Sequence, residues 1–249
     1  MTAPWRVAIP SYERAATLAR CTLPTLINGG VDPDLIDIWV SDAGQRAEYL
    51  ATLSPGTYGG VIVAAPTLRG ARNHIARAYP AGTRLLCVDD DVRALKAKAD
   101  KKLVPITDVA AVVDRGFREM ERARARIWGI YPASNAMFMK DGVRTGLTYI
   151  IGSFWGVHLR GDPCELVTLE DKEDVERSCR FFERDGTVCR LEDVTVISNY
   201  YTEPGGMQVT RTPQRVSSSA RRMVEMFPRL ATYWERKDGT AEVRLREKR

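Results

Sequence analysis

The sequence lacks the features that mark membrane-spanning and disulfide-stapled proteins. No apolar run approaches the roughly 20 residues that cross a bilayer, and Met1–Arg6 lacks the charged and then apolar stretches of a secretory signal. The cysteines fit neither a disulfide framework nor a CxxC zinc site, because they are odd in number and not closely paired: Cys21, Cys87, Cys164, Cys179 and Cys189. We therefore expect a cytoplasmic protein without a membrane partner, whose cysteines are reduced and structural.

Repeats and long Ser/Pro linkers are also missing. The 249 residues, 44% hydrophobic and 28% charged, suffice for one sizeable core. Charge is unevenly placed, because residues 211–249 hold eleven Lys or Arg against five Asp or Glu, a net +6, whereas the rest carries −1. This excess either attracts a polyanion such as nucleic acid or forms a solvated basic helix. We expect one domain over 1–210 and a basic, helical extension over 211–249 that packs on it.

Short apolar strands alternate with helical segments over about the first ninety residues. Strands are expected at 6–9, 36–40, 61–63 and 84–88, and helices at 17–26, 46–53 and 70–79. This order predicts parallel βαβ units with right-handed crossovers. In such sheets ligands bind beyond the carboxyl ends of the strands.

The second half has a less regular pattern. Residues 93–102 are rich in Lys and Ala and predict a helix or a mobile loop, and 109–126 predicts an amphipathic helix. Strand-like stretches with turns between them follow at 127–130, 136–139, 148–151 and 156–159, and a last helix is expected over 169–185. The predicted fold class is therefore α/β with a mixed sheet in the second half.

Polar residues follow three of the expected strands, at 10–14, 41–42 and 89–91. The strongest signal is Asp89-Asp90-Asp91, because adjacent carboxylates repel one another unless a cation or other positive groups neutralise them. Such hard oxygen ligands suit Mg²⁺ or Mn²⁺, which commonly bridge to a diphosphate. An isolated triplet of this kind is more often an acidic surface turn, but its place at the end of a parallel strand favours a metal site.

Arg69, Gly70 and Arg72 stand at the start of an expected helix, directly before Asn73. Guanidinium groups and helix N-termini both favour phosphate, so the two arginines could hold a diphosphate that faces the carboxylates. Alternatively, Arg72 forms a structural ion pair with Asp89 or Asp90.

A second acidic cluster, over 170–176, opens the last expected helix. Acids in a first helical turn are favoured by the helix dipole, which explains about half of the cluster. A carboxylate at a helix entrance is also suited to act as a general base toward an acceptor hydroxyl.

In order along the chain, these segments resemble the motifs of GT-A glycosyltransferases related to family 2. The matching segments are Val7–Arg14 with Thr22–Leu26, Arg72-Asn73, Val88–Asp91, and Glu173–Arg180 with Gly186, which together cover roughly residues 5 to 200. The resemblance implies a Rossmann-like nucleotide-binding half and a mixed central sheet flanked by helices. It also implies sugar transfer from a nucleoside diphosphate sugar, with a UDP-sugar favoured and with Mn²⁺ or Mg²⁺ as cofactor.

The resemblance also assigns roles to individual residues. Asp89 and Asp91 would hold the metal and the donor diphosphate, and Asp174, preceded by Glu173, would be the catalytic base, with Glu170-Asp171 as the alternative. The donor would be bound by a larger set: Pro10, Ser11, Tyr12, Arg14, Asp42, Arg69, Arg72, Asn73, Asp89 and Asp90.

The late part of the chain departs from this pattern. Many metal-dependent relatives supply a late histidine ligand, and no histidine follows His158 here. Either Asn199 takes that place or the metal relies on Asp91, diphosphate and water. His158 lies in an apolar strand and is interpreted as a structural or acceptor-side residue.

Two further segments, Ile151–His158 and Gly205-Gly206-Met207, are more similar to the small phage and bacterial enzymes associated with TET/JBP-type base hydroxylases. Those enzymes glycosylate hydroxymethylated pyrimidines in DNA. The resemblance implies 5-hydroxymethylcytosine as acceptor and an inverting reaction, in the host cytoplasm if a phage encodes the protein. The basic tail, including Ser217–Arg222, would contact phosphates while a flipped base meets Asp174.

Three alternatives stay open at this stage. Phe154 and Trp155 either stack on the base or sugar or belong to the core. The acceptor could instead be a polysaccharide, a lipid or a protein. The chain could also be a nucleotide- and DNA-binding protein without catalytic activity.

Overall fold

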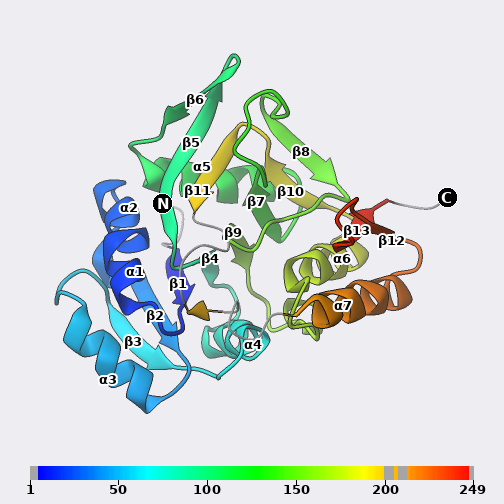
Figure 1. Ribbon diagram of the computed structural model, residues 1–249. Coiled ribbons are helices and arrows are strands. Elements are labelled where there is room, and N and C mark those ends of the chain that lie inside the picture. The colour runs from blue at the N-terminus through cyan, green and yellow to red at the C-terminus, as the bar shows by residue number, and fades with distance from the viewer. Residues whose placement is uncertain (1–4, 199–204, 207–211, 247–249) are drawn as a thin grey trace.

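The computed structural model describes residues 5–198, 205–206 and 212–246, and its centre is an eight-stranded sheet (Figure 1). Along the sheet the strands follow the order β3-β2-β1-β4-β9-β7-β10-β8. Their bounds are Gly60–Val63 (β3), Ile36–Val40 (β2), Arg6–Pro10 (β1), Arg84–Val88 (β4), Phe154–His158 (β9), Ile127–Ile130 (β7), Val188–Leu191 (β10) and Val143–Gly146 (β8).

Six of these strands run in the same direction. β1 pairs in parallel with β2 and β4, β2 with β3, and β7 with β10. β9 is antiparallel to both β4 and β7, so β7 and β10 point the same way as β4, while β8 is an antiparallel edge strand. The six carboxyl ends therefore lie at one edge, called here the carboxyl edge. The predicted α/β fold with a mixed sheet is confirmed.

Helices cover both faces of the sheet. α1 (Ala15–Arg20), α2 (Thr22–Asn28), α3 (Ala43–Thr52) and α5 (Val109–Arg122) contribute to the core on one face. α4 (Leu68–Ala78) and α6 (Glu173–Asp185) pack on the other face through buried Ile75 and Phe181. Two short 3-10 helices, Pro33–Leu35 and Pro163–Glu165, complete the connections.

Trp128 on β7 sets the spacing between the sheet and α5. Its fully buried indole meets Phe117 of α5 and Phe154 of β9 edge-on, at centroid distances of 5.6 and 6.1 Å. A Cβ atom at Gly116 would stand 2.4 Å from the indole, and one at Gly156 would stand 2.1 Å from it. The two glycines therefore let a helix and a strand close on one ring, as dense core packing requires.

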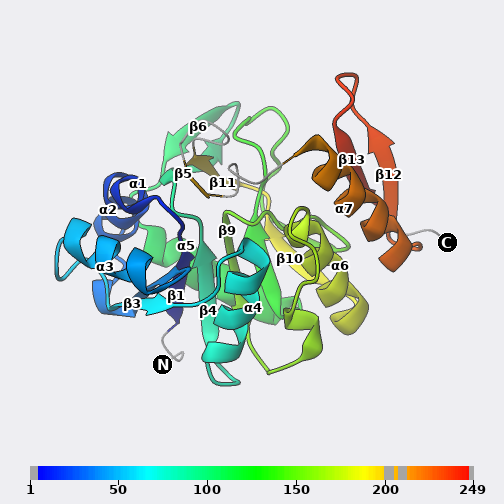
Figure 2. The ribbon, with the colours of Figure 1, turned by 60° about the horizontal axis from the view of Figure 1, so that its bottom comes forward.

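Two smaller sheets complete the fold. β5 (Val92–Ala99), β6 (Lys102–Pro105) and β11 (Val194–Ser198) form an antiparallel sheet in the order β11-β5-β6. α7 (Pro213–Met226) precedes the hairpin of β12 (Ala231–Glu235) and β13 (Ala241–Leu245). Met223 of α7 shares a buried apolar cluster with Val175 and Cys179 of α6, and Figures 1 and 2 show this C-terminal unit at the α6 end of the molecule.

Three kinds of local prediction were wrong in the middle of the chain. Residues 93–102 form β5 and the turn into β6 rather than a helix or loop, because pairing with the distant β11 outweighs the local preference of Lys and Ala. Residues 136–139 and 148–151 are not strands. β8 was missed because its side chains are mostly exposed and show no apolar alternation.

Helix bounds also differ from the predictions. The helix expected over 17–26 is divided at Cys21 into α1 and α2, and the helix expected from 169 begins at Glu173. After α7 the chain forms the β12–β13 hairpin, which its basic composition did not predict. Charge alone therefore did not identify the structure of this segment.

All five cysteines are buried and none is in a disulfide. Burial raises the pKa of Cys87 to about 11, so its thiol stays protonated at neutral pH. No helix in the described ranges has both the length and the apolar character needed to span a membrane.

Gly156→Ala tests the packing around Trp128. The added methyl group has no space beside the indole, so we expect the free energy of unfolding to fall by about 3 kcal/mol. Gly60→Ala is the matched control, because its Cβ would meet only ordinary contacts at 3.7 Å or more in an edge strand. Urea unfolding of both variants measures the difference. Equal stability of the two variants would contradict this account of the glycines.

Candidate active site

The carboxyl edge gathers the three polar segments that follow β1, β2 and β4. These strands are neighbours in the sheet, so the loop Ser11–Arg14, the pair Ser41-Asp42 and the triplet Asp89–Asp91 lie side by side. The topology thereby brings together residues predicted from separate stretches of sequence.

Asp90 fixes the loop that follows β1. Its carboxylate accepts hydrogen bonds from Ser11 Oγ at 2.6 Å and from Arg14 Nη1 at 3.2 Å. The hydroxyl of Tyr49, from α3, lies 2.7 Å from Ser11 Oγ and accepts the backbone N–H of Arg14 at 3.0 Å. Burial raises the pKa of Asp90 to about 6, opposed by Arg14 and Ser11. Asp90 is thus engaged in holding the loop, and Tyr49 is a site residue that the sequence pattern did not reveal.

Gly205 and Gly206 lie against the same loop. Gly205 O accepts from Arg14 Nη2 at 3.0 Å, and Gly206 N–H donates to Tyr12 O at 3.1 Å. Both glycines have positive φ, +80° and +67°, and a Cβ atom on either would stand 2.7 Å from Glu13 O or Arg14 Cζ. The positive φ favours glycine at both positions, and at Gly205 the backbone oxygen of Glu13 also leaves no space for a side chain.

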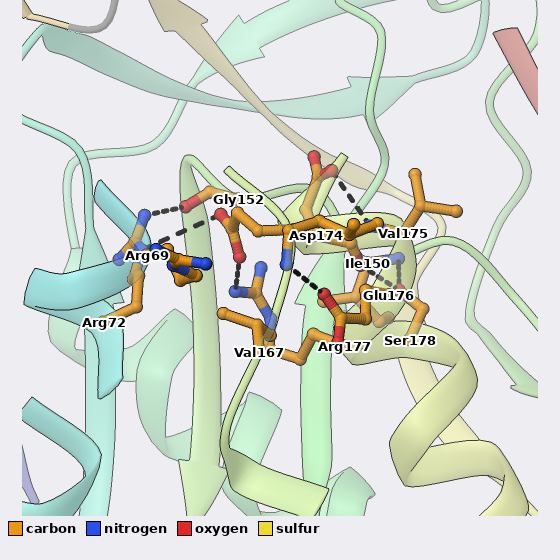
Figure 3. A network of polar contacts seen from close by, with 12 residues as sticks. Arg69, Arg72, Ile150, Gly152, Val167, Asp174, Val175, Glu176, Arg177 and Ser178 are labelled. Atoms are coloured by element: carbon orange, nitrogen blue, oxygen red, sulfur yellow. Dashed lines mark hydrogen bonds and ion pairs between the residues drawn. The ribbon is translucent and has the colours of Figure 1, made fainter. Parts of the chain in front are cut away.

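Arg72 of α4 joins the triplet to the rest of the site. Its Nη2 donates to Asp89 Oδ1 at 2.7 Å. The same nitrogen donates to Gly152 O at 2.9 Å (Figure 3). The Arg72 side chain is only 4% exposed, whereas that of Asp89 is 36% exposed. Burial raises the pKa of Asp89 to about 6; Arg72 opposes this shift, and Asp91 and Glu173 add to it. The structural ion pair considered for Arg72 is therefore present, with Asp89 as its partner.

Glu173 stands on the other side of the same guanidinium. Its Oε1 lies 3.8 Å from Arg72 Nε, and its Oε2 accepts from Arg177 Nη1 at 2.5 Å. The Arg177 guanidinium stacks on Trp155, 3.7 Å from the ring centroid. Asp89, Arg72, Glu173 and Arg177 form a row of alternating charge, so the two acidic segments meet although they are far apart in sequence.

Asp174 is the half-buried carboxylate beside this row. Tyr149 Oη donates to its Oδ2, and the N–H of Val175 donates to its Oδ1 at 2.9 Å. Figure 3 shows the Asp174 carboxylate pointing away from Arg177. Within the part of the chain that the structure describes, no ion pair involves Asp174. Tyr149, which the sequence pattern did not identify, orients this carboxylate.

The neighbouring acids are engaged elsewhere. Glu170 pairs with Arg69 at 2.9 Å, and Asp171 is buried and accepts from Arg215 Nε of α7 at 2.5 Å. Glu176 is fully buried and accepts the backbone N–H groups of Thr168 and Leu169. The geometry favours Asp174 over Asp171 as a proton acceptor, because Asp171 is both less accessible and paired with an arginine.

Asn73 and Asp42 have structural roles. The amide of Asn73 forms a pair of 2.8 Å hydrogen bonds with the backbone of Val167. Asp42 caps α3 by accepting from Gln45 N at 2.9 Å, and its hydrogen bond from Ser41 is the main cause of its lowered pKa. Among the other donor-loop residues, Pro10 is buried and Tyr12 is 37% exposed.

The position of β9 decides between the alternatives considered for Phe154, Trp155 and His158. Phe154 and Trp155 are core side chains, 0% and 6% exposed, so stacking on a substrate base is not available to them. His158 pairs with Arg84 at the amino end of β4, at the edge opposite the carboxyl edge. The acceptor-side interpretation of His158 is therefore wrong, and burial lowers its pKa as expected of a structural histidine.

The residues present fit a cation only together with other ligands. Asp91 Oδ2 lies 4.0 Å from Arg14 Nη1, and its side chain is 10% exposed. In the described ranges no three His, Cys, Asp or Glu side chains form a metal-binding group, and Asn199 lies outside those ranges. Two carboxylates completed by diphosphate oxygens and water are a usual ligand set for Mg²⁺, and Asp89 and Asp91 supply two such carboxylates.

No protein-family model and no curated protein matches this sequence. Solved structures resemble the chain: S. aureus TarS 1–349 in complex with UDP aligns over 90% of this chain and 65% of that one, with a TM-score of 0.55 at 12% identity. The chain has the GT-A fold. Longer S. aureus TarS gives 0.54 at 12% identity, over 90% of this chain and 39% of that one. A mycobacterial protein gives 0.51 at 8% identity, over 97% and 83%.

The GT-A chain is thus shorter than the proteins it resembles, spanning less than two thirds of the TarS chains. Its own geometry must carry any statement about a reaction. The arrangement offers two accessible acidic positions, Asp89 after β4 and Asp174 at the start of α6, connected through Arg72 and Glu173.

Arg72→Gln tests the central ion pair. Removing the guanidinium leaves Asp89 without its ion-pair partner and Glu173 with Arg177 alone, beside the core, so we expect stability at neutral pH to fall by about 3 kcal/mol. Arg69→Gln is the matched control on the same helix: its ion pair is exposed and should contribute less than about 1 kcal/mol. Thermal unfolding of both variants checks this. A small loss for Arg72→Gln, similar to that for Arg69→Gln, would contradict the assigned importance of Arg72.

Proposed function

We propose that this chain is an inverting glycosyltransferase that moves a sugar from a nucleoside diphosphate sugar, with a UDP-sugar favoured, to 5-hydroxymethylcytosine in DNA. The observation that carries the proposal is the meeting of Asp89 and Glu173 on one guanidinium, Arg72. It places the segment after β4 and the start of α6 together at the carboxyl edge of a GT-A fold. The UDP complex of TarS supports the choice of donor.

The donor would lie along the loop after β1 and over the triplet after β4. Tyr12 is exposed there, and Arg14 is held by Asp90. Arg69, with a side chain 45% exposed near the N-terminus of α4, is placed to meet a phosphate. A divalent cation, Mn²⁺ or Mg²⁺, held by Asp89 and Asp91 would supply positive charge for the diphosphate.

Asp174 is the proposed catalytic base. Its carboxylate takes the proton of the acceptor hydroxyl as that oxygen bonds to the anomeric carbon, and the bond from that carbon to the diphosphate oxygen breaks. The nucleoside diphosphate leaves with the electron pair, and the anomeric configuration inverts. Tyr149 and the N–H of Val175 hold the carboxylate in place during this step.

The proposed DNA acceptor is supported by the charge of the C-terminal segment and by its position. We propose residues 1–210 as the catalytic domain and 211–249 as its DNA-contacting extension. α7 packs on α6, the helix that presents Asp174, and Arg215 of α7 binds Asp171 two residues before α6. DNA phosphates bound by the C-terminal segment would therefore lie near the catalytic base, Asp174. A reaction on DNA with a nucleotide sugar would take place in the cytoplasm.

Asp174→Asn tests the assignment of the base. The amide cannot accept the proton, so we expect kcat for transfer to fall by about 10²- to 10⁴-fold. Donor binding, measured by calorimetry with UDP-glucose and Mn²⁺, should stay within about twofold, since Asp174 lies apart from the proposed donor loop. Glu183→Gln, an exposed acid farther along α6, is the control and should retain full activity. Parallel loss of donor binding and transfer would make Asp174 a structural residue.

A transfer assay tests the acceptor. Purified protein is incubated with a panel of UDP-sugars and with matched duplexes that carry cytosine or 5-hydroxymethylcytosine. We expect labelled sugar only on the hydroxymethylated duplex, because unmodified cytosine offers no exocyclic hydroxyl group. Donor hydrolysis without DNA transfer would point to a polysaccharide, lipid or protein acceptor. If the protein shows no hydrolysis and no transfer with any sugar, this result would favour a binding protein that lacks catalysis.

A further inference from the structure

The connection between β7 and β8 carries the two most exposed large apolar side chains in the described part of the chain. Met137 is 73% exposed and Phe138 is 68% exposed, whereas the other exposed large apolar residues there lie between 36% and 43%. We call Asn135–Lys140 the apolar tip. Adjacent side chains of this size, directed into solvent, are uncommon in a monomer unless they meet a partner.

The apolar tip is anchored on both sides. Ala136 and Met139, which flank the exposed pair, are 7% and 4% exposed. Asn135 closes the turn, because its Oδ1 accepts the N–H of Met137 at 3.0 Å and its carbonyl oxygen accepts the N–H of Phe138 at 3.1 Å. The inward residues thus fix the outward direction of Met137 and Phe138.

The apolar tip belongs to the same edge as the proposed site. It follows the carboxyl end of β7, a strand parallel to β4, so it rises from the edge that also carries the triplet after β4. Figures 1 and 2 both show this loop beside the β5–β6 hairpin. Lys98 of β5 confirms the proximity, because its Nζ lies 2.7 Å from Asp141 Oδ1.

The hairpin beside the apolar tip is rich in basic residues. Lys96 and Lys98 share one face of β5, since strand side chains alternate, and exposed lysines occupy the turn into β6. Residues 96–102 and 135–144 together contain two acids, Asp100 and Asp141, and six basic residues: Lys96, Lys98, Lys101, Lys102, Lys140 and Arg144. An apolar point within a cationic rim is complementary to a stacked polyanion.

We propose that Met137 and Phe138 insert into the base stack of duplex DNA and fill the space left when the target base turns out toward Asp174. This inference rests on the proposed DNA acceptor and adds how the target base is brought out of the duplex. Proteins that kink or unstack DNA frequently insert apolar side chains such as Met or Phe between base steps. The β5–β6 lysines would hold the phosphates on either side.

A membrane surface would also attract an apolar tip with a basic rim, but the size of the tip favours DNA. A single myristoyl chain, with more apolar carbon than Met137 and Phe138 together, gives only marginal membrane binding. The same two side chains are enough for one base step. Vesicle binding is therefore kept as an outcome that would overturn the proposal.

The test replaces both side chains, Met137→Ser with Phe138→Ser, and compares duplex with single-stranded DNA of the same sequence, each carrying 5-hydroxymethylcytosine. We expect kcat/KM on the duplex to fall about tenfold or more, and on the single strand to change less than about twofold, because only the duplex must be unstacked. Leu50→Ser is the control, an exposed apolar residue on α3. Unchanged donor hydrolysis and unfolding temperature show that the fold is intact.

The outcomes separate two proposals, the insertion of Met137 and Phe138 into the base stack, called here the wedge, and the DNA acceptor. Equal activity of wild type and double variant on the duplex, or equal loss on both DNAs, overturns the wedge and leaves the DNA acceptor standing. If the wild-type protein transfers no sugar to DNA, the proposed DNA acceptor is wrong, and the insertion of Met137 and Phe138 is then tested with an unmodified duplex that contains the fluorescent base 2-aminopurine. A rise in 2-aminopurine fluorescence with the wild-type protein, absent with the double variant, supports the insertion. No rise, or binding only to phosphatidylglycerol vesicles, overturns it.

Discussion

The guanidinium of Arg72 occupies a position between two carboxylates that the fold brings together from opposite halves of the sequence. Without a partner, a charged Asp89 beside the core would destabilise the folded protein, as its raised pKa of about 6 indicates, and the charge of Glu173 would destabilise it further. Arg72 compensates Asp89, shares Glu173 with Arg177, and also donates to the backbone at Gly152. The positions of α4, the end of β4 and the start of α6 are therefore coupled, and Asp174 takes its position from the same helix.

Much of the first half was predictable, because its strands are buried and its helices alternate with them. The segments after β1, β2 and β4 could be placed at one edge from the βαβ order alone, and the structure has them there. The second half was less predictable. β5 depends on pairing with β11, and β8 has an exposed surface, so neither leaves a clear local pattern in the sequence.

The site itself could be predicted by residue type but not by partner. The sequence indicated acids at 89–91 and 170–176 without showing which of them remain accessible. That depends on contacts over long separations: Asp90 with Arg14, Asp171 with Arg215, and Glu176 with the backbone of Thr168. Tyr49 and Tyr149 were missed for the same reason, since a tyrosine acquires its role from the group that its hydroxyl reaches.

The contact of Gly205 and Gly206 with the loop after β1 has a consequence for finding related chains. Both positions disfavour a side chain by their backbone conformation, and at Gly205 a Cβ atom would also meet the backbone oxygen of Glu13. Distant homologues could replace most of the surface and still fold in this way, but a substitution at Gly205 would push the two segments apart. Paired glycines about 190 residues after a Ser-Tyr-x-Arg loop are therefore a signature that divergence should spare.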